Sequence, residues 1–204
     1  MNLKAADRQR QILLAAAECF ARKGFHQTTM DDIAREAGIS AGLIYRHFAG
    51  KEELIIELVK TNTRVQQTKL DQARQYKDFA QTIEAFFDIG DDIIDWHTRS
   101  VLLVEVVAES LRNKRVADVV VQDDIDFIHE FAALITQAQS QGQIDPSLAP
   151  LETAELLVAL TEGMLLRLSL ASEDDDFDEA TFNKTLKTLY TRFLGLKPAT
   201  GEAA

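Results

Sequence analysis

Apolar residues recur three and four positions apart along most of this chain, and that spacing places them on one face of an α-helix. No segment shows convincing strict alternation of apolar and polar residues, which would indicate a strand. The pattern therefore predicts an all-α fold of about nine helices. Their expected ranges are 6–23, 29–37, 40–48, 51–76, 78–97, 99–113, 115–141, 151–172 and 178–195.

The second and third of these helices are short and carry clear end signals. Thr29 with Asp32 fits a capping box at the start of the second helix. Gly38 suits a turn residue with positive φ, and Ser40 is expected to cap the third helix. The segment TMDDIAREAGISAGLIYRHF, residues 29–48, thus has the spacing of a helix-turn-helix.

The apolar positions of this segment predict which side of it is buried. A shared core is expected to combine Ile33, Ala37, Ile39, Ile44 and Phe48 with Ile12, Ala16 and Phe20 of the first helix. The other side of the third helix then stays free, with Ala41, Gly42, Leu43, Tyr45, Arg46 and His47. Small residues at its start would let the backbone approach DNA base edges. The alternative is a helical packing unit that binds no nucleic acid.

Residues 10–54 resemble the DNA-binding head of the TetR family of bacterial transcriptional regulators. The likeness rests on ILLAAAECFARKGF, TTMDDIAREAGIS and AGLIYRHFAGKEEL at fixed spacings, over about a fifth of the chain. It implies a DNA-binding domain over residues 1–50, and a ligand-sensing and dimerisation domain over residues 51–204. The boundary lies at the start of the long helix from Lys51, which would carry motions to the head as a rigid rod.

The resemblance also implies which residues contact DNA. Phosphates would be held by Thr29, Tyr45, His47 and Lys51. Ser40, Ala41, Gly42, Leu43 and Arg46 would lie at the major groove. The implied protein is a repressor that binds a palindromic double-stranded operator as a homodimer and is released by a small molecule. A DNA-binding regulator with no small-molecule trigger, or one that activates, is the alternative.

Charge and composition qualify this interpretation. The formal net charge of −11 is unfavourable for a partner of phosphate, but residues 1–60 carry nine Lys and Arg against eight Asp and Glu. The acidic excess therefore belongs to the rest of the chain. Cys19 is the only cysteine, which excludes an internal disulfide. No signal-peptide core or membrane-length apolar run occurs, and a cytoplasmic protein without membrane association is expected.

No enzyme signature is found in the chain. It has no nucleophile elbow, paired-histidine metal motif or phosphate-binding glycine loop, and its four histidines share no ligand spacing. We therefore expect neither catalysis nor a cofactor nor a metal. Pairing Glu105 with His97 as acid and base would be the enzyme alternative. The acidic run at residues 173–179 is interpreted as a solvated loop, with a metal site as the alternative.

The ligand-sensing residues are harder to infer. Glu105 lies in the apolar stretch VLLVEVVAES, where a buried carboxylate needs a partner. It either pairs with Arg112 or Arg99, lies on an exposed stripe, or contacts a ligand. Aromatic residues at helical spacing belong either to a pocket or to the core. The candidate pocket set is Phe86, Trp96, His97, Glu105, Glu109, Phe127 and Phe131.

The last two predicted helices carry wide apolar stripes. With the resemblance, these predict a two-fold dimer interface of four helices, and an intramolecular core is the alternative. The candidate interface residues are Leu157, Leu160, Met164, Leu168, Phe182, Leu186, Leu189, Tyr190 and Phe193.

Overall fold

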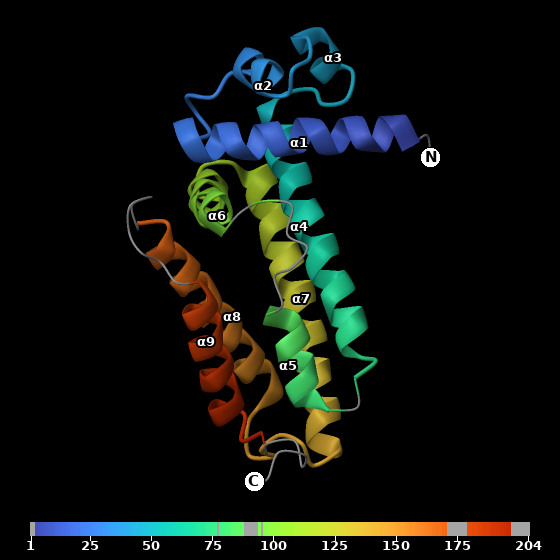
Figure 1. Ribbon diagram of the computed structural model, residues 1–204, viewed down its shortest axis with the longest axis vertical. Helices are drawn as coiled ribbons and strands as arrows, with labels where there is room; N and C mark the ends of the chain where they lie inside the picture. Colours follow the sequence, from blue (N-terminus) through green and yellow to red (C-terminus); the bar gives the residue numbers. More distant parts are fainter. Residues whose placement is uncertain (1–2, 77, 88–93, 95, 171–178, 197–204) are drawn as a thin grey trace. The chain divides into compact units, whose positions relative to one another are not determined.

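The structure is a computed structural model that describes residues 3–76, 78–87, 94, 96–170 and 179–196. In this part of the chain every regular element is a helix, which confirms the all-α prediction, and none of these helices is long and apolar enough to cross a membrane. The helices are α1 (Leu3–Lys23), α2 (Met30–Glu36), α3 (Ala41–Tyr45), α4 (Lys51–Ala73), α5 (Phe79–Phe87), α6 (Trp96–Ser110), α7 (Lys114–Ser140), α8 (Pro150–Leu168) and α9 (Glu179–Phe193) (Figure 1).

One predicted helix corresponds to two helices in the structure. The pattern predicts a helix over residues 78–97, whereas α5 ends at Phe87 and Trp96 already begins α6. Ile94 between them is not helical, and residues 88–93 and 95 lie outside the described residues. The apolar spacing is helical in both segments, so the sequence pattern did not show that they are separate helices.

The chain forms two compact units. The first comprises Met1–Asn62, Asp92–Asp123 and Leu165–Leu170, and the second comprises Thr63–Asp91, Asp124–Met164 and Ala171–Ala204. Besides the head, the first unit includes the start of α4, α6 and the first part of α7.

The first unit is built on the predicted helix-turn-helix core. Ile12, Phe20, Ile33 and Ile44 are fully buried, and Phe48 is 4% exposed. The remaining predicted members also belong to this core, with Ala16 and Ala37 buried and Ile39 partly buried against it. The predicted wedge between α1, α2 and α3 is thereby confirmed. Cys19 lies in the same core as a fully buried free thiol.

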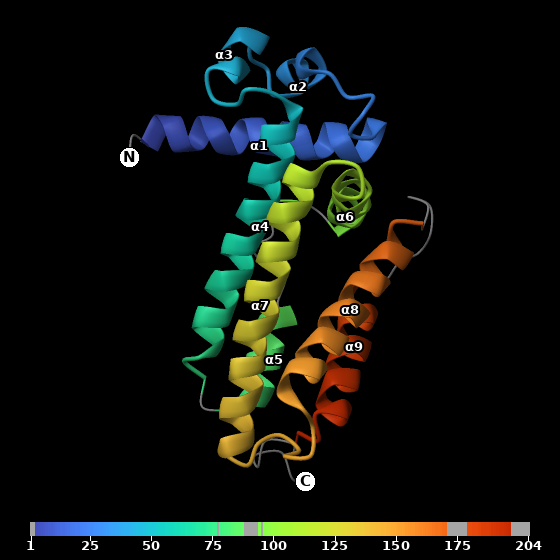
Figure 2. The ribbon, with the colours of Figure 1, turned by 180° about the vertical axis from the view of Figure 1, so that it is seen from behind.

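Helix α6 packs on the head within this unit. It crosses beside α1, as both views of the ribbon show (Figures 1 and 2). Val106 of α6 and Val116 of α7 join the buried cluster of the head, and Leu102 packs against it. The head core therefore extends beyond the three N-terminal helices.

The second unit has a core of its own. Its buried residues come from the end of α4, from α5, from α7 to α9 and from the segments next to them, and they include Leu70, Ile135 and, just after α9, Leu194. Tyr190 of α9 is buried, and its hydroxyl donates to the Leu157 carbonyl at 2.8 Å. The same hydroxyl lies 2.7 Å from Thr161 Oγ1.

Three of the nine expected dimer residues belong to this intramolecular core. Leu157, Leu186 and Tyr190 are at most 3% exposed in the single chain. Their side chains are thus already covered by the same chain, and the intramolecular alternative holds for them. Leu160, Met164 and Phe182 pack against that core partly buried, while Leu189 and Phe193 are exposed. The side chain of Leu168 lies outside the described residues.

Candidate nucleic-acid interface

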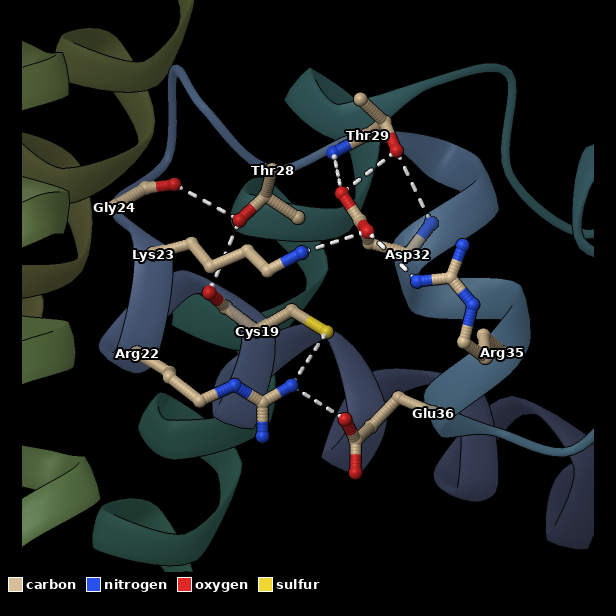
Figure 3. A network of polar contacts seen from close by, with 9 residues as sticks. All are labelled: Cys19, Arg22, Lys23, Gly24, Thr28, Thr29, Asp32, Arg35 and Glu36. Atoms are coloured by element: carbon tan, nitrogen blue, oxygen red, sulfur yellow. Dashed lines mark hydrogen bonds and ion pairs between the residues drawn. The ribbon is translucent and has the colours of Figure 1, made fainter.

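The start of α2 is fixed by the predicted capping box (Figure 3). Thr29 Oγ1 accepts a hydrogen bond from the Asp32 amide at 3.1 Å. In return, the Thr29 amide donates to Asp32 Oδ2 at 3.0 Å. These two bonds satisfy backbone donors that a helix start otherwise leaves free. Thr29 is therefore held in place at the exposed rim of the head.

Asp32 is also the centre of a small charged cluster on the head. Its Oδ1 lies 2.7 Å from Lys23 Nζ and 3.2 Å from Arg35 Nη1. The hydrogen bond from Lys23, followed by those from the side chain and amide of Thr29, holds the pKa of Asp32 well below its usual range. The carboxylate thus ties α1 to α2.

Thr28 links the loop before α2 to α1, whereas Thr29 is the cap of α2. Its buried hydroxyl donates to the Cys19 carbonyl at 3.0 Å and to the Gly24 carbonyl at 2.8 Å (Figure 3). Gly24 has φ +80°, a conformation that glycine adopts readily. The loop between the two helices is consequently ordered by its own hydrogen bonds.

The turn and the start of α3 follow the sequence prediction, while α3 ends at Tyr45, three residues before the predicted end at residue 48. Gly38 has φ +64° and ends α2, and its successor Ile39 donates its amide to the Ala34 carbonyl at 3.0 Å. Ser40 Oγ accepts from the Leu43 amide at 3.3 Å and caps α3. Because Ile44 is fully buried, α3 keeps one fixed side toward solvent.

The free side of α3 carries the expected DNA-contact residues. Tyr45 is 55% exposed, and Arg46 directly after it is exposed as well. No residue in the described part of the chain forms a hydrogen bond or ion pair with either of these side chains. Ser40, Gly42 and Thr29 are exposed, while Ala41, Leu43 and His47 are partly buried.

Three other basic residues of the head are neutralised by carboxylates. Arg22 pairs with Glu36 at 2.5 Å, and Lys23 and Arg35 share Asp32. The Arg22 guanidinium lowers the pKa of Glu36, chiefly through their hydrogen bond. Arg46, by contrast, presents an exposed guanidinium without an acidic partner among the described residues, directly after Tyr45 in the chain.

Lys51, which the resemblance places at a phosphate, makes contacts within the head. Its ammonium donates to the Phe25 carbonyl at 2.6 Å and to the His26 carbonyl at 3.0 Å. It also lies 4.8 Å from the centre of the Phe25 ring. Burial lowers the pKa of this amine, and nearby Glu109 opposes that effect. The Lys51 side chain thus holds the loop after α1.

The expected ligand residues divide between the two units. His97, Glu105 and Glu109 belong to the first unit, and Phe127 and Phe131 belong to the second. Phe131 is buried and Phe127 partly buried, with ring centres 6.2 Å apart, which places both in the core of the second unit.

The side chains of Phe86 and Trp96 lie outside the described residues, as does the acidic run at residues 173–178. Within the described ranges, no group of three or more His, Cys, Asp or Glu is arranged to hold a metal ion.

Glu105 has a partner that the sequence did not indicate. Its Oε2 accepts from the Phe25 amide at 2.7 Å, and not from Arg99 or Arg112. The apolar surroundings of Glu105 did signal that it needs a partner. A backbone amide 80 residues away leaves no signal of its own in the sequence.

Comparisons with known proteins agree with this geometry. Residues 12–58 match the family described as bacterial regulatory proteins of the tetR family, and residues 94–195 match the BetI-type transcriptional repressor C-terminal family. The HTH-type transcriptional regulator UidR of Escherichia coli K12 is 29% identical, over 93% of this chain and 94% of its own.

Solved structures show the same arrangement. Salmonella enterica GusR superposes with a TM-score of 0.72 at 29% identity, over 93% of this chain and 96% of its own. A regulator from Saccharomonospora viridis in complex with choline has a TM-score of 0.74 at 19% identity, over 95% and 100% of the two chains. With a helix-turn-helix head and a C-terminal family that together span most of its length, the chain belongs to the TetR family of bacterial transcriptional regulators.

Proposed function

We propose that this protein is a repressor that binds palindromic operator DNA as a homodimer and leaves it when a small molecule binds. The observation that carries the DNA-binding part is the exposure of Tyr45 and Arg46 beside the fully buried Ile44. Burial of Ile44 prevents α3 from rotating to hide its free side. α3 is accordingly the recognition helix of this proposal.

The chemistry of the free side of α3 fits duplex DNA. The Arg46 guanidinium presents a planar fork of donors that matches the O6 and N7 acceptors of guanine in the major groove. The side chains of Thr29, Tyr45 and His47 would donate to phosphates and fix the register. Ser40, Ala41, Gly42 and Leu43 are small or only partly exposed and would allow close approach to the bases. Lys51 contributes indirectly, through the loop that it holds.

The dimer part of the proposal relies on α8 and α9 of the second unit. Leu156 is 55% exposed on α8, and Leu189 and Phe193 are 42% and 38% exposed on α9. The exposed residues around them are acidic on α8, at Glu152 and Glu155, and basic on α9, at Lys184 and Arg192. A two-fold axis would place α8 of one protomer near α9 of the other, so that unlike charges face each other.

The ligand part of the proposal relies on the charge balance. Since the acidic excess lies outside residues 1–60, a cationic molecule is favoured over an anionic one. The choline complex of the S. viridis regulator concerns a protein of the same fold at 19% identity, so choline serves as the first test compound. The molecule would bind among the helices after α4.

The test begins with a duplex selected from random sequences by the purified protein. Fluorescence anisotropy then gives the Kd of the wild type and of Tyr45→Ala and Arg46→Ala. We expect each substitution to weaken binding by about tenfold or more, since a base contact contributes roughly 1–3 kcal/mol. For Arg46→Ala, the loss of affinity should depend on which base the side chain contacts in the duplex. For Tyr45→Ala, the loss of affinity should be the same for all duplex sequences.

Tyr76→Ala provides the matched control, because Tyr76 is a similarly exposed tyrosine of the second unit, at 44%. Its Kd should equal that of the wild type. Equal Kd values for the wild type and both head variants would contradict the assignment of α3 as the recognition helix. Choline and other small cations are then added to the complex one at a time, and one of these cations should raise the Kd of the protein for the duplex. Release by an anion alone would contradict the charge argument.

A further inference from the structure

A set of polar contacts in the first unit joins α6 to the head, away from the DNA-contact residues. We call this set the α6 clasp. It consists of Glu105, Glu109 and Asn113 on one side and of Phe25, His26, Lys51 and Glu52 on the other. All seven residues belong to the same compact unit.

The first contact of the α6 clasp is made by Glu105. Its carboxylate accepts the Phe25 amide proton at 2.7 Å in a partly buried setting. The backbone at Gly24 passes so close that a Cβ there would lie 3.6 Å from Glu105 Oε1. Hydrogen bonds to a charged acceptor are among the stronger ones in proteins. Glu105 therefore fixes the first peptide after the end of α1.

Lys51 holds the same loop through its carbonyl groups. The ammonium donates to the carbonyl oxygens of Phe25 and His26 at 2.6 and 3.0 Å. Phe25 is thus bound at its amide by a negative group from α6 and at its carbonyl by a positive group from α4. The position of this one residue depends on both helices.

Glu109 adds a negative charge behind these contacts. It is 6% exposed, and its Oε1 accepts from Asn113 Nδ2 at 3.2 Å. Its buried Oε2 accepts no hydrogen bond from any residue that the structure describes, and lies 3.4 Å from His26 Nε2. A buried acceptor without a donor lowers stability. The charge is nevertheless close enough to Lys51 to raise the pKa of that amine against the effect of burial.

A second set of hydrogen bonds connects α4 to the turn between α6 and α7 and to the start of α7. Asn113 Nδ2 donates to Glu52 Oε2 at 2.8 Å, and Arg115 Nη1 donates to Glu52 Oε1 at 2.7 Å. These two bonds lower the pKa of Glu52, and the bond from Asn113 has the larger effect. The first turn of α4 is therefore connected to the same segment that binds the loop after α1.

We propose that Glu105 is a positioning residue through which α6 sets the orientation of α2 and α3 for DNA. The connection is the loop of residues 24–29, held at one end by Glu105 and ending at Thr29, the N-cap of α2. A displacement of α6 would therefore be transmitted to α2 and α3 through this loop, without first being transmitted along α4. This inference rests on the proposed function and adds the residue that couples α6 to DNA binding.

Coupling between two places in a protein is reciprocal, so operator DNA can serve as the probe of α6. The experiment measures amide hydrogen exchange of the full-length protein with and without the selected duplex. In the wild type, DNA is expected to slow exchange about fivefold or more in peptides covering residues 24–29 and 101–110. DNA contacts only the head in this proposal, so slowing in α6 reports the coupling.

Three variants separate coupling from folding. In Glu105→Ala, the duplex should still slow exchange in α2 and α3, but the response of residues 101–110 should be lost. Glu105→Gln keeps an acceptor oxygen for the Phe25 amide and should retain the response. Val107→Ala shortens an exposed side chain of the same helix and serves as the control. Thermal melts without DNA identify any general loss of structure.

The outcomes distinguish this inference from the function on which it rests. A bound duplex with no response in α6 of the wild type overturns the coupling. An equal response in Glu105→Ala, or a loss in Glu105→Gln as complete as in Glu105→Ala, overturns the role of the Phe25 hydrogen bond. Failure to select any duplex overturns the proposed function itself, and the inference with it.

Discussion

Single residues of the head show how much of its geometry is decided by backbone conformation. Gly38 has φ +64°, and Gly42 has ordinary helical geometry within α3. A Cβ at either position would meet nothing within 4 Å. Alanine at these two sites therefore differs from glycine through the backbone alone, with no change in packing.

Alanine at these two positions should change the free energy of unfolding in opposite directions. Gly38→Ala should lower the free energy of unfolding by about 1–2 kcal/mol, because alanine resists the left-handed conformation. Gly42→Ala should raise it, by less than about 1 kcal/mol, because alanine favours a helix. Urea unfolding followed by circular dichroism measures both. Shifts of the same sign would contradict the conformations assigned to these residues.

The sequence predicts residues whose role is local and misses those whose partner is distant. Gly38, Ser40 and the pair Thr29 and Asp32 act within four positions of their partners, so their spacing identified them. Glu105 acts on an amide 80 positions away. Any apolar helix with one carboxylate would look the same in sequence, whatever its partner.

At the scale of elements, α2 depends on contacts beyond its own seven residues. Its helix start is capped by Thr29, and Asp32 in its first turn is bound by Lys23 of α1. At its end, the Ala37 carbonyl accepts from Gln11 Nε2 at 2.6 Å. A helix this short is unstable alone, so α1 and the cap together maintain it.

The charge of Asp32 predicts a pH dependence of the head. Its pKa is lower in the folded than in the unfolded state, so its stabilisation is complete above the unfolded value of about 3.9 and is lost as the pH falls below it. Asp32→Asn should therefore melt at a lower temperature than the wild type at pH 7. The difference should shrink as the pH falls below about 4. A difference that stays constant with pH would contradict the role of the charge.

Helix boundaries were predicted where the sequence carries a cap or a glycine, as at α2, α3 and the start of α4. The separation of α5 from α6 was missed because apolar residues have helical spacing in both segments. Periodicity reports which face is buried, and two consecutive helices can share that pattern.

At the scale of the whole molecule, part of the apolar stripes on α8 and α9 is buried in the core of the same chain. Leu157, Leu186 and Tyr190 pack inside their own chain, whereas Leu156, Leu189 and Phe193 are exposed and available to the proposed dimer partner. Sequence alone does not separate the two sets, because a core and a dimer interface both require apolar residues at helical spacing. Burial in the single chain separates them.

This division gives a test of the proposed dimer. Leu189→Glu places a charge on the exposed stripe of α9 and should yield a monomer in sedimentation velocity. Its affinity for the selected duplex should fall by about a hundredfold or more, because two linked heads bind far better than one. Leu111→Glu, at a leucine of the first unit that is 82% exposed, should remain dimeric. A dimeric Leu189→Glu would contradict the assigned face.

The fully buried Cys19 has a practical consequence for following the head in solution. It is the only thiol of the chain, and burial raises its pKa, so the folded head shields it from alkylating reagents. Modification then requires the core between α1 and α2 to open. The rate at which a thiol reagent labels the native protein therefore reports how often this core opens. Cys19 thus allows local opening of the head to be measured without introducing a label.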